Sequence, residues 1–162
     1  MLVEVKVGAL IMDPNSSTPI VVLKGVDSEA ILPIWVGAYE ANAIALEIEK
    51  MVPPRPMTHD LLRNFIIETN YIVEKIIVSD LIENTFHALI ELKDNQGRSV
   101  SLDARPSDAI ALALRADCQI FIAQKVLDIS NATSSASTDP KEVREFDEDI
   151  QKPIEEWPDL IG

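Results

Sequence analysis

The order of strand and helix patterns along the sequence limits the possible folds of this chain more than any other feature. Seven short strand-like segments are interrupted by three helical segments. Residues 1–12 alternate apolar side chains with Glu4 and Lys6, which is the period-two pattern of a half-buried strand. Further strand patterns occur at 19–25, 30–36, 71–81, 85–93, 98–103 and 119–123. Helical patterns occur at 38–51, 58–70 and 106–117. The first three strands are expected to form an antiparallel meander, because short connections join them.

The composition favours one compact domain followed by a tail. The chain has 162 residues, of which 47% are hydrophobic, enough for one buried core. We expect this domain to span residues 1–127 and to end in a helical turn near Leu127. Residues 130–138 are rich in serine and threonine and lack a burial pattern, as in a linker. An acidic, flexible tail is therefore expected over residues 128–162.

The charge of the chain argues against a general nucleic-acid-binding surface. The net charge is −13, and residues 128–162 hold ten acidic and three basic side chains. The remaining body is thus near −6, whereas a polyanion is normally met by clustered lysine and arginine. Any action on nucleic acid would have to rest on a local site.

Cysteine content and hydropathy bear on the cellular compartment. Cys118 is the single cysteine, which excludes an intramolecular disulfide and a multi-cysteine zinc site. This fits a reducing compartment, and we expect Cys118 to be a small buried apolar residue. No apolar stretch approaches the length of a membrane span. We therefore expect a soluble cytoplasmic protein with no membrane partner.

Two Arg-Pro pairs precede helix starts. Arg55-Pro56 lies before the helical segment that follows Thr58, and Arg105-Pro106 opens the segment that contains Ser107. Proline fixes its own φ and favours extended geometry in the preceding residue, so each arginine is held beside a helix N-terminus. Free N–H groups and the positive end of the helix dipole make such places suitable for phosphate. Thr58 and Ser107 are predicted to be the N-caps.

The sequence resembles the bifunctional nuclease domain family. The resemblance covers roughly residues 1–127, and its matching stretches are 32–37, 40–46, 53–61 and 103–111. It implies a single α+β domain with a mixed, curled, roll-like sheet packed against about three helices. It also implies a homo-oligomer, with a dimer favoured, and nuclease activity of the kind described for plant members on RNA and DNA.

Hydrolysis of a phosphodiester needs an activated water molecule and neutralisation of the negative charge at the scissile phosphate. Many nucleases meet both needs with carboxylates that hold divalent ions. Candidate catalytic residues are His59, Asp60, Asp103 and Asp108, and candidate ligands of Mg²⁺ or Mn²⁺ are Glu40, Asp103 and Asp108. His59 could serve as general base or acid. Arg55 and Arg105 are the candidate phosphate-binding residues, since a guanidinium matches two oxygens.

Structural roles remain open for the same residues. In this alternative, Asp60 and Asp108 each only complement a helix dipole, and Asp103 pairs with Arg105. Trp35 is expected in the core or a subunit interface rather than in base stacking. The alternative function is a noncatalytic regulatory or interaction domain that binds an anionic ligand or a protein. A further hypothesis is that the acidic tail masks the anion site.

Overall fold

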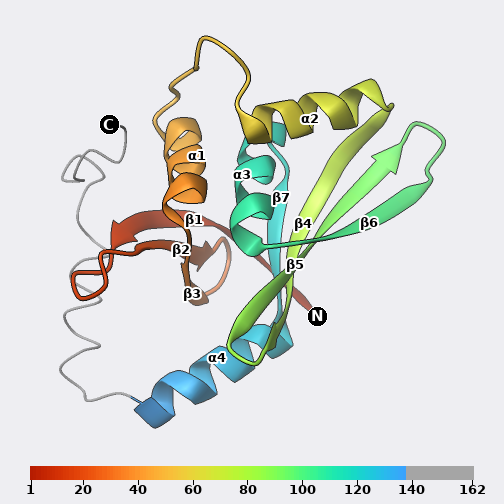
Figure 1. Cartoon of the computed structure of the whole chain (residues 1–162). Helices are drawn as coiled ribbons and strands as arrows, with labels where there is room; N and C mark the ends of the chain where they lie inside the picture. Colours follow the sequence, from red (N-terminus) through yellow and green to blue (C-terminus); the bar gives the residue numbers. More distant parts are fainter. Residues whose placement is uncertain (138–162) are drawn as a thin grey trace.

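The structure, a computed structural model, describes residues 1–137, and its central feature is a seven-stranded mixed sheet (Figure 1). The strands are β1 (Leu2–Met12), β2 (Pro19–Gly25), β3 (Ile31–Trp35), β4 (Tyr71–Ile82), β5 (Thr85–Asp94), β6 (Ser99–Ala104) and β7 (Gln119–Ala123). The helices are α1 (Ala38–Ile48), α2 (Thr58–Glu68), α3 (Pro106–Ala116) and α4 (Gln124–Ser137).

Strand β7 joins two antiparallel halves of the sheet. The strand order is β3-β2-β1-β7-β4-β5-β6, with β7 antiparallel to β1 and parallel to β4. Ile120 of β7 is in register with Val5 on one side and Ile76 on the other, and all three side chains are buried. This row carries the hydrophobic core across the junction, so the two halves form one sheet.

Helix α3 lies between α1 and α2 and contacts both (Figure 1). Its residues from Ala109 to Ala113 are at most 1% exposed, so the helix is covered on all sides. Alternating alanine with Ile110 and Leu112 lets neighbouring elements approach closely while filling the core. The N-terminus of α3 is thereby held in a fixed position between two other helices.

The structure confirms the predicted α+β class, the mixed sheet and the N-terminal meander. Every predicted strand is present with each end within one residue of its expected position. Helices α1 and α2 end earlier than predicted, because Lys50 and Asn70 take positive φ angles of 56° and 63°. No helix among residues 1–137 is both long and apolar enough to cross a membrane.

Both predicted N-caps are wrong. Met57 is the N-cap of α2, because its N–H donates to Asp60 Oδ2 at 2.9 Å and Thr58 is already helical. At α3, Pro106 takes the first helical position, so Arg105 is the N-cap and Ser107 is buried in the first turn.

The predicted linker is also wrong over the described residues, since α4 runs to Ser137. Hydroxyl groups of Thr133 and Ser134 donate to carbonyls of Ile129 and Ser130 in the preceding turn, so these polar residues are accommodated within the helix. From residue 138 onward, the predicted acidic tail and its proposed masking role lie outside the described residues.

Candidate functional site

The start of α3 holds an arginine and an aspartate in direct contact. Arg105 caps the helix with extended backbone geometry, and Asp108 follows in the first turn. Arg105 Nε and Nη2 both donate to Asp108 Oδ2, at 2.9 and 2.8 Å. Because Pro106 fixes the backbone between them, the helix start itself presents this pair.

Helix α1 adds a second carboxylate to the same guanidinium. Arg105 Nη2 donates to Glu40 Oε1 at 2.7 Å, and the Glu40 side chain is only 15% exposed. Gly37, the N-cap of α1, leaves the space that this carboxylate uses, since a Cβ atom there would overlap Glu40 Oε2. The glycine therefore allows Glu40 to fold back toward its own helix start.

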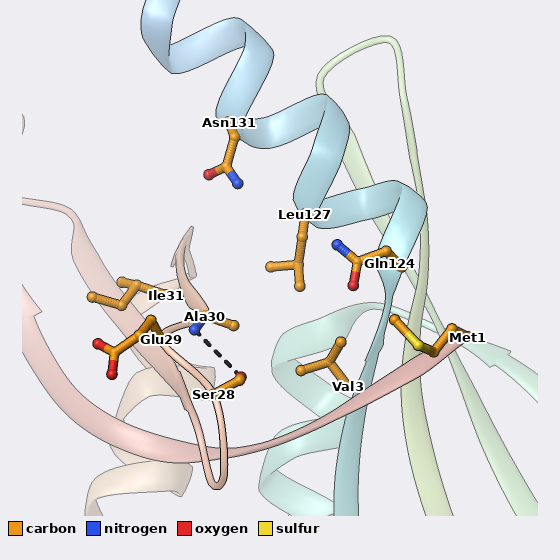
Figure 2. Close-up of a pocket in the computed structure, with 9 residues that line it drawn as sticks. All are labelled: Met1, Val3, Ser28, Glu29, Ala30, Ile31, Gln124, Leu127 and Asn131. Atoms are coloured by element: carbon orange, nitrogen blue, oxygen red, sulfur yellow. Dashed lines mark hydrogen bonds between the residues drawn. The ribbon is translucent and has the colours of Figure 1, made fainter.

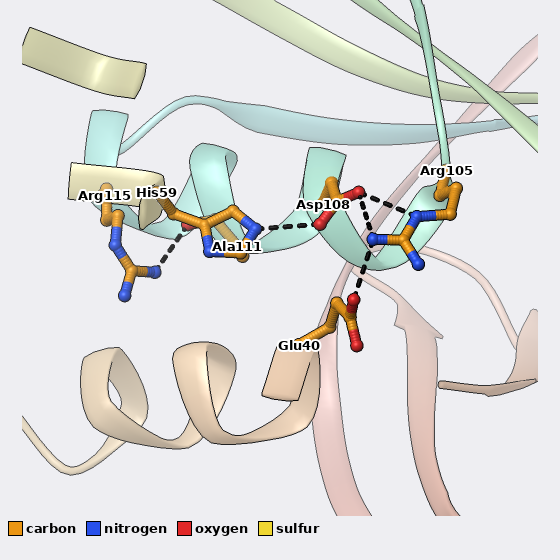
Figure 3. A network of polar contacts seen from close by, with 6 residues as sticks. All are labelled: Glu40, His59, Arg105, Asp108, Ala111 and Arg115. Atoms are coloured by element: carbon orange, nitrogen blue, oxygen red, sulfur yellow. Dashed lines mark hydrogen bonds and ion pairs between the residues drawn. The ribbon is translucent and has the colours of Figure 1, made fainter. Parts of the chain in front are cut away.

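Helix α2 contributes a histidine to the other oxygen of Asp108. His59 Nε2 lies 2.9 Å from Asp108 Oδ1, and the His59 side chain is 12% exposed. Asp108 thus divides its two oxygens between His59 and Arg105, as Figure 3 shows. We call Glu40, His59, Arg105 and Asp108 the helix-junction network, since α1, α2 and α3 meet there.

A second ion pair locks α2 to α3 beside this network. Arg115 Nε donates to Asp60 Oδ1 at 2.8 Å. Figure 3 shows the second contact of this side chain, in which Arg115 Nη1 donates to the carbonyl of Ala111 at 2.9 Å. The Arg115 side chain is 3% exposed. Since Asp60 follows His59 directly, this buried pair fixes the first turn of α2 and hence the position of His59.

These contacts shift the pKa of two groups. Burial acts to raise the pKa of Asp60, but hydrogen bonds from the Met57 N–H and Arg115, together with the Arg115 charge, lower it overall. The hydrogen bond to Asp108, followed by that to Glu40, raises the pKa of Arg105. Asp60 is therefore held as a carboxylate and Arg105 as a cation across the neutral pH range.

Comparison with known proteins identifies the family. The bifunctional nuclease domain matches residues 21–135, which include every residue of the helix-junction network and Arg115. This chain belongs to the bifunctional nuclease domain family.

The relatives include bacterial and plant proteins. Uncharacterized protein MT1877 of Mycobacterium tuberculosis is 32% identical over 159 residues, which cover 98% of this chain and 94% of that protein. Bifunctional nuclease 1 of Oryza sativa subsp. indica is 25% identical over 109 residues, which cover 65% of this chain and 33% of the rice protein. Bifunctional nuclease of Oryza minuta matches to the same extent.

Within this bifunctional nuclease domain, some of the predicted site residues come together and others do not. Glu40, His59, Arg105 and Asp108 form one network, and Asp60 lies at its edge. Arg55 is exposed in the loop before α2, and Asp103 is exposed on β6; neither side chain joins the network. Their predicted roles in phosphate binding and catalysis stay predictions.

Arg115 was missed by the sequence reasoning. No role was predicted for this residue, which lies in the last turn of α3. The available signal was its spacing, since positions seven apart share a helix face and Arg115 lies seven after Asp108. An arginine on that face could have been linked to the acidic start of α2.

The fit to a divalent metal ion depends on the two carboxylates that share Arg105. Glu40 Oε1 and Asp108 Oδ2 both lie within 2.8 Å of Arg105 Nη2, so they converge on one positive group. Residues 1–137 contain no group of three or more His, Cys, Asp or Glu side chains placed to hold a metal. Mg²⁺ commonly takes one or two carboxylates together with water and substrate phosphate. Glu40 Oε2, which makes no hydrogen bond within residues 1–137, is an oxygen that fits such an ion without displacing Arg105.

A cavity of about 490 Å³ lies away from this network, between the N-terminus of β1, the β2–β3 loop and α4 (Figure 2). Its wall mixes apolar side chains, among them Val3, Ile31 and Leu127, with polar ones, among them Glu29 and Gln124. None of the network residues lines this cavity.

Proposed function

We propose that this domain is a nuclease that hydrolyses phosphodiester bonds of RNA, DNA or both. The observation that carries the proposal is the contact of one carboxylate, Asp108, with both an imidazole and a guanidinium at a helix start. Family membership and the name of the rice relatives support the same activity. The single, half-buried cysteine, Cys118, fits a reducing compartment, and we place the activity in the cytoplasm.

In this proposal His59 transfers the proton. A hydrogen bond donated from His59 Nε2–H to Asp108 leaves Nδ1 as the acceptor, so Nδ1 can take a proton from the attacking water. The carboxylate holds the ring in one orientation and stabilises the imidazolium that forms. This is the relation between base and orienting group that activates nucleophiles in many hydrolases.

Arg105 binds the scissile phosphate. Its side chain is 66% exposed, and Nη1 makes no contact with residues 1–137, so two N–H groups can donate to phosphate while Nε and Nη2 keep their carboxylate partners. The α3 N-terminus adds the positive end of its dipole. Arg55, in the exposed loop before α2, is proposed to contact the substrate backbone further along.

A Mg²⁺ or Mn²⁺ ion is part of the proposal. Glu40 would hold it through Oε2, and Asp103, two residues before Arg105, is the proposed further ligand. Asp108 would join them by exchanging one of its contacts with His59 or Arg105 for the ion. When bound, such an ion neutralises charge on the phosphate and lowers the pKa of a bound water. Asp60 is assigned to positioning, because both of its oxygens are engaged by Met57 and Arg115.

A noncatalytic anion-binding domain is the second candidate. The observation that favours it is the pair of ion pairs at Arg105: two carboxylates of the protein itself already neutralise the positive charge of the guanidinium. In that case an anionic metabolite or protein would replace a carboxylate at the guanidinium, and no bond would be cleaved.

The test is cleavage of single-stranded RNA and DNA by the purified full chain, with added Mg²⁺ or Mn²⁺ and with a chelator. We compare wild type with Asp108→Asn and His59→Gln. The matched control is Asp128→Asn, on α4, where the carboxylate accepts only from Gln124. The proposal expects activity in wild type and the control and its loss in both network variants. An inert wild type, or full activity of Asp108→Asn, would contradict it.

A further inference from the structure

Tyr39 is the most exposed aromatic side chain among residues 1–137. It lies in the first turn of α1, and 90% of its surface is open to solvent. Tyrosine normally contributes to a fold by burying its large ring. A ring left in solvent contributes little to the packing of the described residues, so its place beside other groups is what matters.

Tyr39 immediately precedes Glu40, the carboxylate that α1 contributes to the helix-junction network. The Cα atoms of adjacent residues are only about 3.8 Å apart. Glu40 Oε1 accepts a hydrogen bond from Arg105 Nη2 at 2.7 Å, and Figure 3 shows this side chain pointing from α1 to the guanidinium. An exposed aromatic ring therefore lies next to the ion pair that holds Arg105.

The starts of α1 and α3 are accessible around this ring. Gly37 and Ala38 are exposed, and the Arg105 side chain is 66% exposed. The N-cap side chain of neither helix makes a capping hydrogen bond, so free N–H groups remain in both first turns. Since Gly37 and Ala38 carry no long side chain, a planar group can approach the Tyr39 ring from solvent.

We propose that Tyr39 is the stacking platform for a nucleobase of the substrate, and that the site for this reason takes single-stranded RNA or DNA in preference to a duplex. The proposal rests on the nuclease function proposed above, in which Arg105 binds the scissile phosphate. The phosphate then lies on the guanidinium, and a base next to it lies on the tyrosine ring. Inside a duplex both faces of each base are covered by its neighbours, so only an unpaired base can stack on Tyr39.

The charge of the protein makes such a contact necessary for binding. The net charge is −13, and Arg105 is already paired with two carboxylates, so the attraction for a polyanionic backbone is weak. Stacking of a base on an aromatic ring needs no net positive charge, and every base has a face that can stack. It involves no contact with the 2′-hydroxyl, so RNA and DNA both fit.

The test is the affinity of the full chain for short fluorescein-labelled strands, measured by fluorescence anisotropy with a chelator present to prevent cleavage. The probes are a single DNA strand, a strand of abasic sites with the same number of phosphates, and the matching duplex. Wild type should bind the single strand most tightly. Tyr39→Leu should weaken that binding about 10-fold, within the range for one stacked base, and leave the abasic strand unaffected.

Two variants separate the aromatic ring from other effects of substitution. Tyr39→Phe keeps the ring and should bind the single strand as wild type does. Phe65→Leu is the matched control, because Phe65 is 64% exposed on α2 and lies outside the network. It removes an exposed ring elsewhere and should also bind as wild type does. Circular dichroism checks that all three variants are folded, as expected for exposed positions.

Cleavage by the same proteins distinguishes this inference from the nuclease proposal. If wild type binds the single strand through Tyr39 and cleaves nothing, the nuclease function fails and the stacking role stands. If wild type cleaves, and Tyr39→Leu binds and cleaves single strands equally well, the stacking role fails and the nuclease function stands.

Three further results would overturn the stacking role. The first is an absence of binding of any strand by wild type. The second is wild-type binding that is no tighter for the single strand than for the duplex. The third is a loss in Tyr39→Leu that is as large for the abasic strand as for the strand with bases.

Discussion

His59 Nε2 and Asp108 Oδ1 lie 2.9 Å apart, although the two residues are separated by 49 positions in the chain. They come from the first turns of different helices, and Asp108 also accepts two N–H groups of Arg105 through its second oxygen. One carboxylate therefore sets the position of both the imidazole and the guanidinium. The arrangement makes the three residues depend on each other.

This dependence predicts that the effects of substituting His59 and Asp108 on the cleavage rate do not multiply in the double variant. His59→Gln and Asp108→Asn are each expected to lower the cleavage rate by about 10²-fold or more, the usual contribution of a positioned acid or base. The double variant should be no slower than the slower single variant, because both remove the same unit. Single-turnover cleavage of RNA measures this, and rates that multiply would show independent roles.

Gly37→Ala should separate activity from stability. Gly37 has a φ of −69°, which alanine adopts readily, but the added Cβ would overlap Glu40 Oε2. The flexible Glu40 side chain can move away, so the free energy of unfolding should change by less than about 1 kcal/mol. Loss of the contact between Glu40 and Arg105 should lower nuclease activity. Urea unfolding and a cleavage assay on one preparation measure both, and unchanged activity would argue against a role for Glu40.

Arg115→Met should destabilise the protein strongly. The arginine is 3% exposed and its partner Asp60 is 22% exposed, so its removal leaves a partly buried carboxylate unpaired. We expect a loss of about 2–3 kcal/mol in the free energy of unfolding, below the figure for a fully buried pair because Asp60 still meets water. Lys93→Met is the matched control: the side chains of Lys93 and its partner Glu74 are 44% and 40% exposed, so the change should cost less than about 1 kcal/mol. Equal losses in urea unfolding would contradict the assignment.

The lowered pKa of Asp60 predicts a specific pH dependence. A carboxylate whose pKa is lower in the folded state than its ordinary 3.8 stabilises the fold above that value and loses this contribution as the pH falls through the folded pKa. Asp60→Asn should therefore be less stable than wild type near neutral pH, and the difference should shrink in acid. Urea midpoints across this range test it. A difference that grows in acid would reverse the sign and reject the argument.

Cys118 should react slowly in the folded protein. Burial raises the pKa of its thiol to about 11, so very little reactive thiolate is present at mildly alkaline pH. We expect labelling by a thiol reagent to be slow in buffer and fast in denaturant, followed by absorbance. Rapid labelling of the folded chain would show that the thiol is accessible.

Local sequence patterns were sufficient for the elements themselves. Period-two alternation located β1. The turn between β5 and β6 contains Gly97 with a φ of 79°, a conformation that glycine adopts without strain. The strand order was not predictable in this way. The place of β7 between β1 and β4 depends on contacts of Ile120 with residues far away in the chain, and no local pattern encodes them. The prediction of a linker at the serine-rich end of α4 was wrong, because composition does not reveal that hydroxyl groups can donate hydrogen bonds to carbonyls within a helix.

The candidate site was predictable in part for a similar reason. The Arg-Pro pair and Asp108 lie in one helix start, so their proximity follows from the local sequence. Glu40 and His59 join them only through the packing of α1 and α2 on α3. Arg55 shares the local motif of Arg105 but lies in an exposed loop, which shows that a motif alone does not place a side chain in a network.

The late position of β7 in the chain affects how the protein can be synthesised. During translation, β1–β3 and β4–β6 leave the ribosome before the strand that belongs between them. Until β7 follows, β1 and β4 each present an open edge to solvent, and open edges promote association between nascent chains. A message truncated before residue 119 would thus yield two half-sheets lacking their shared strand, and we expect such fragments to aggregate.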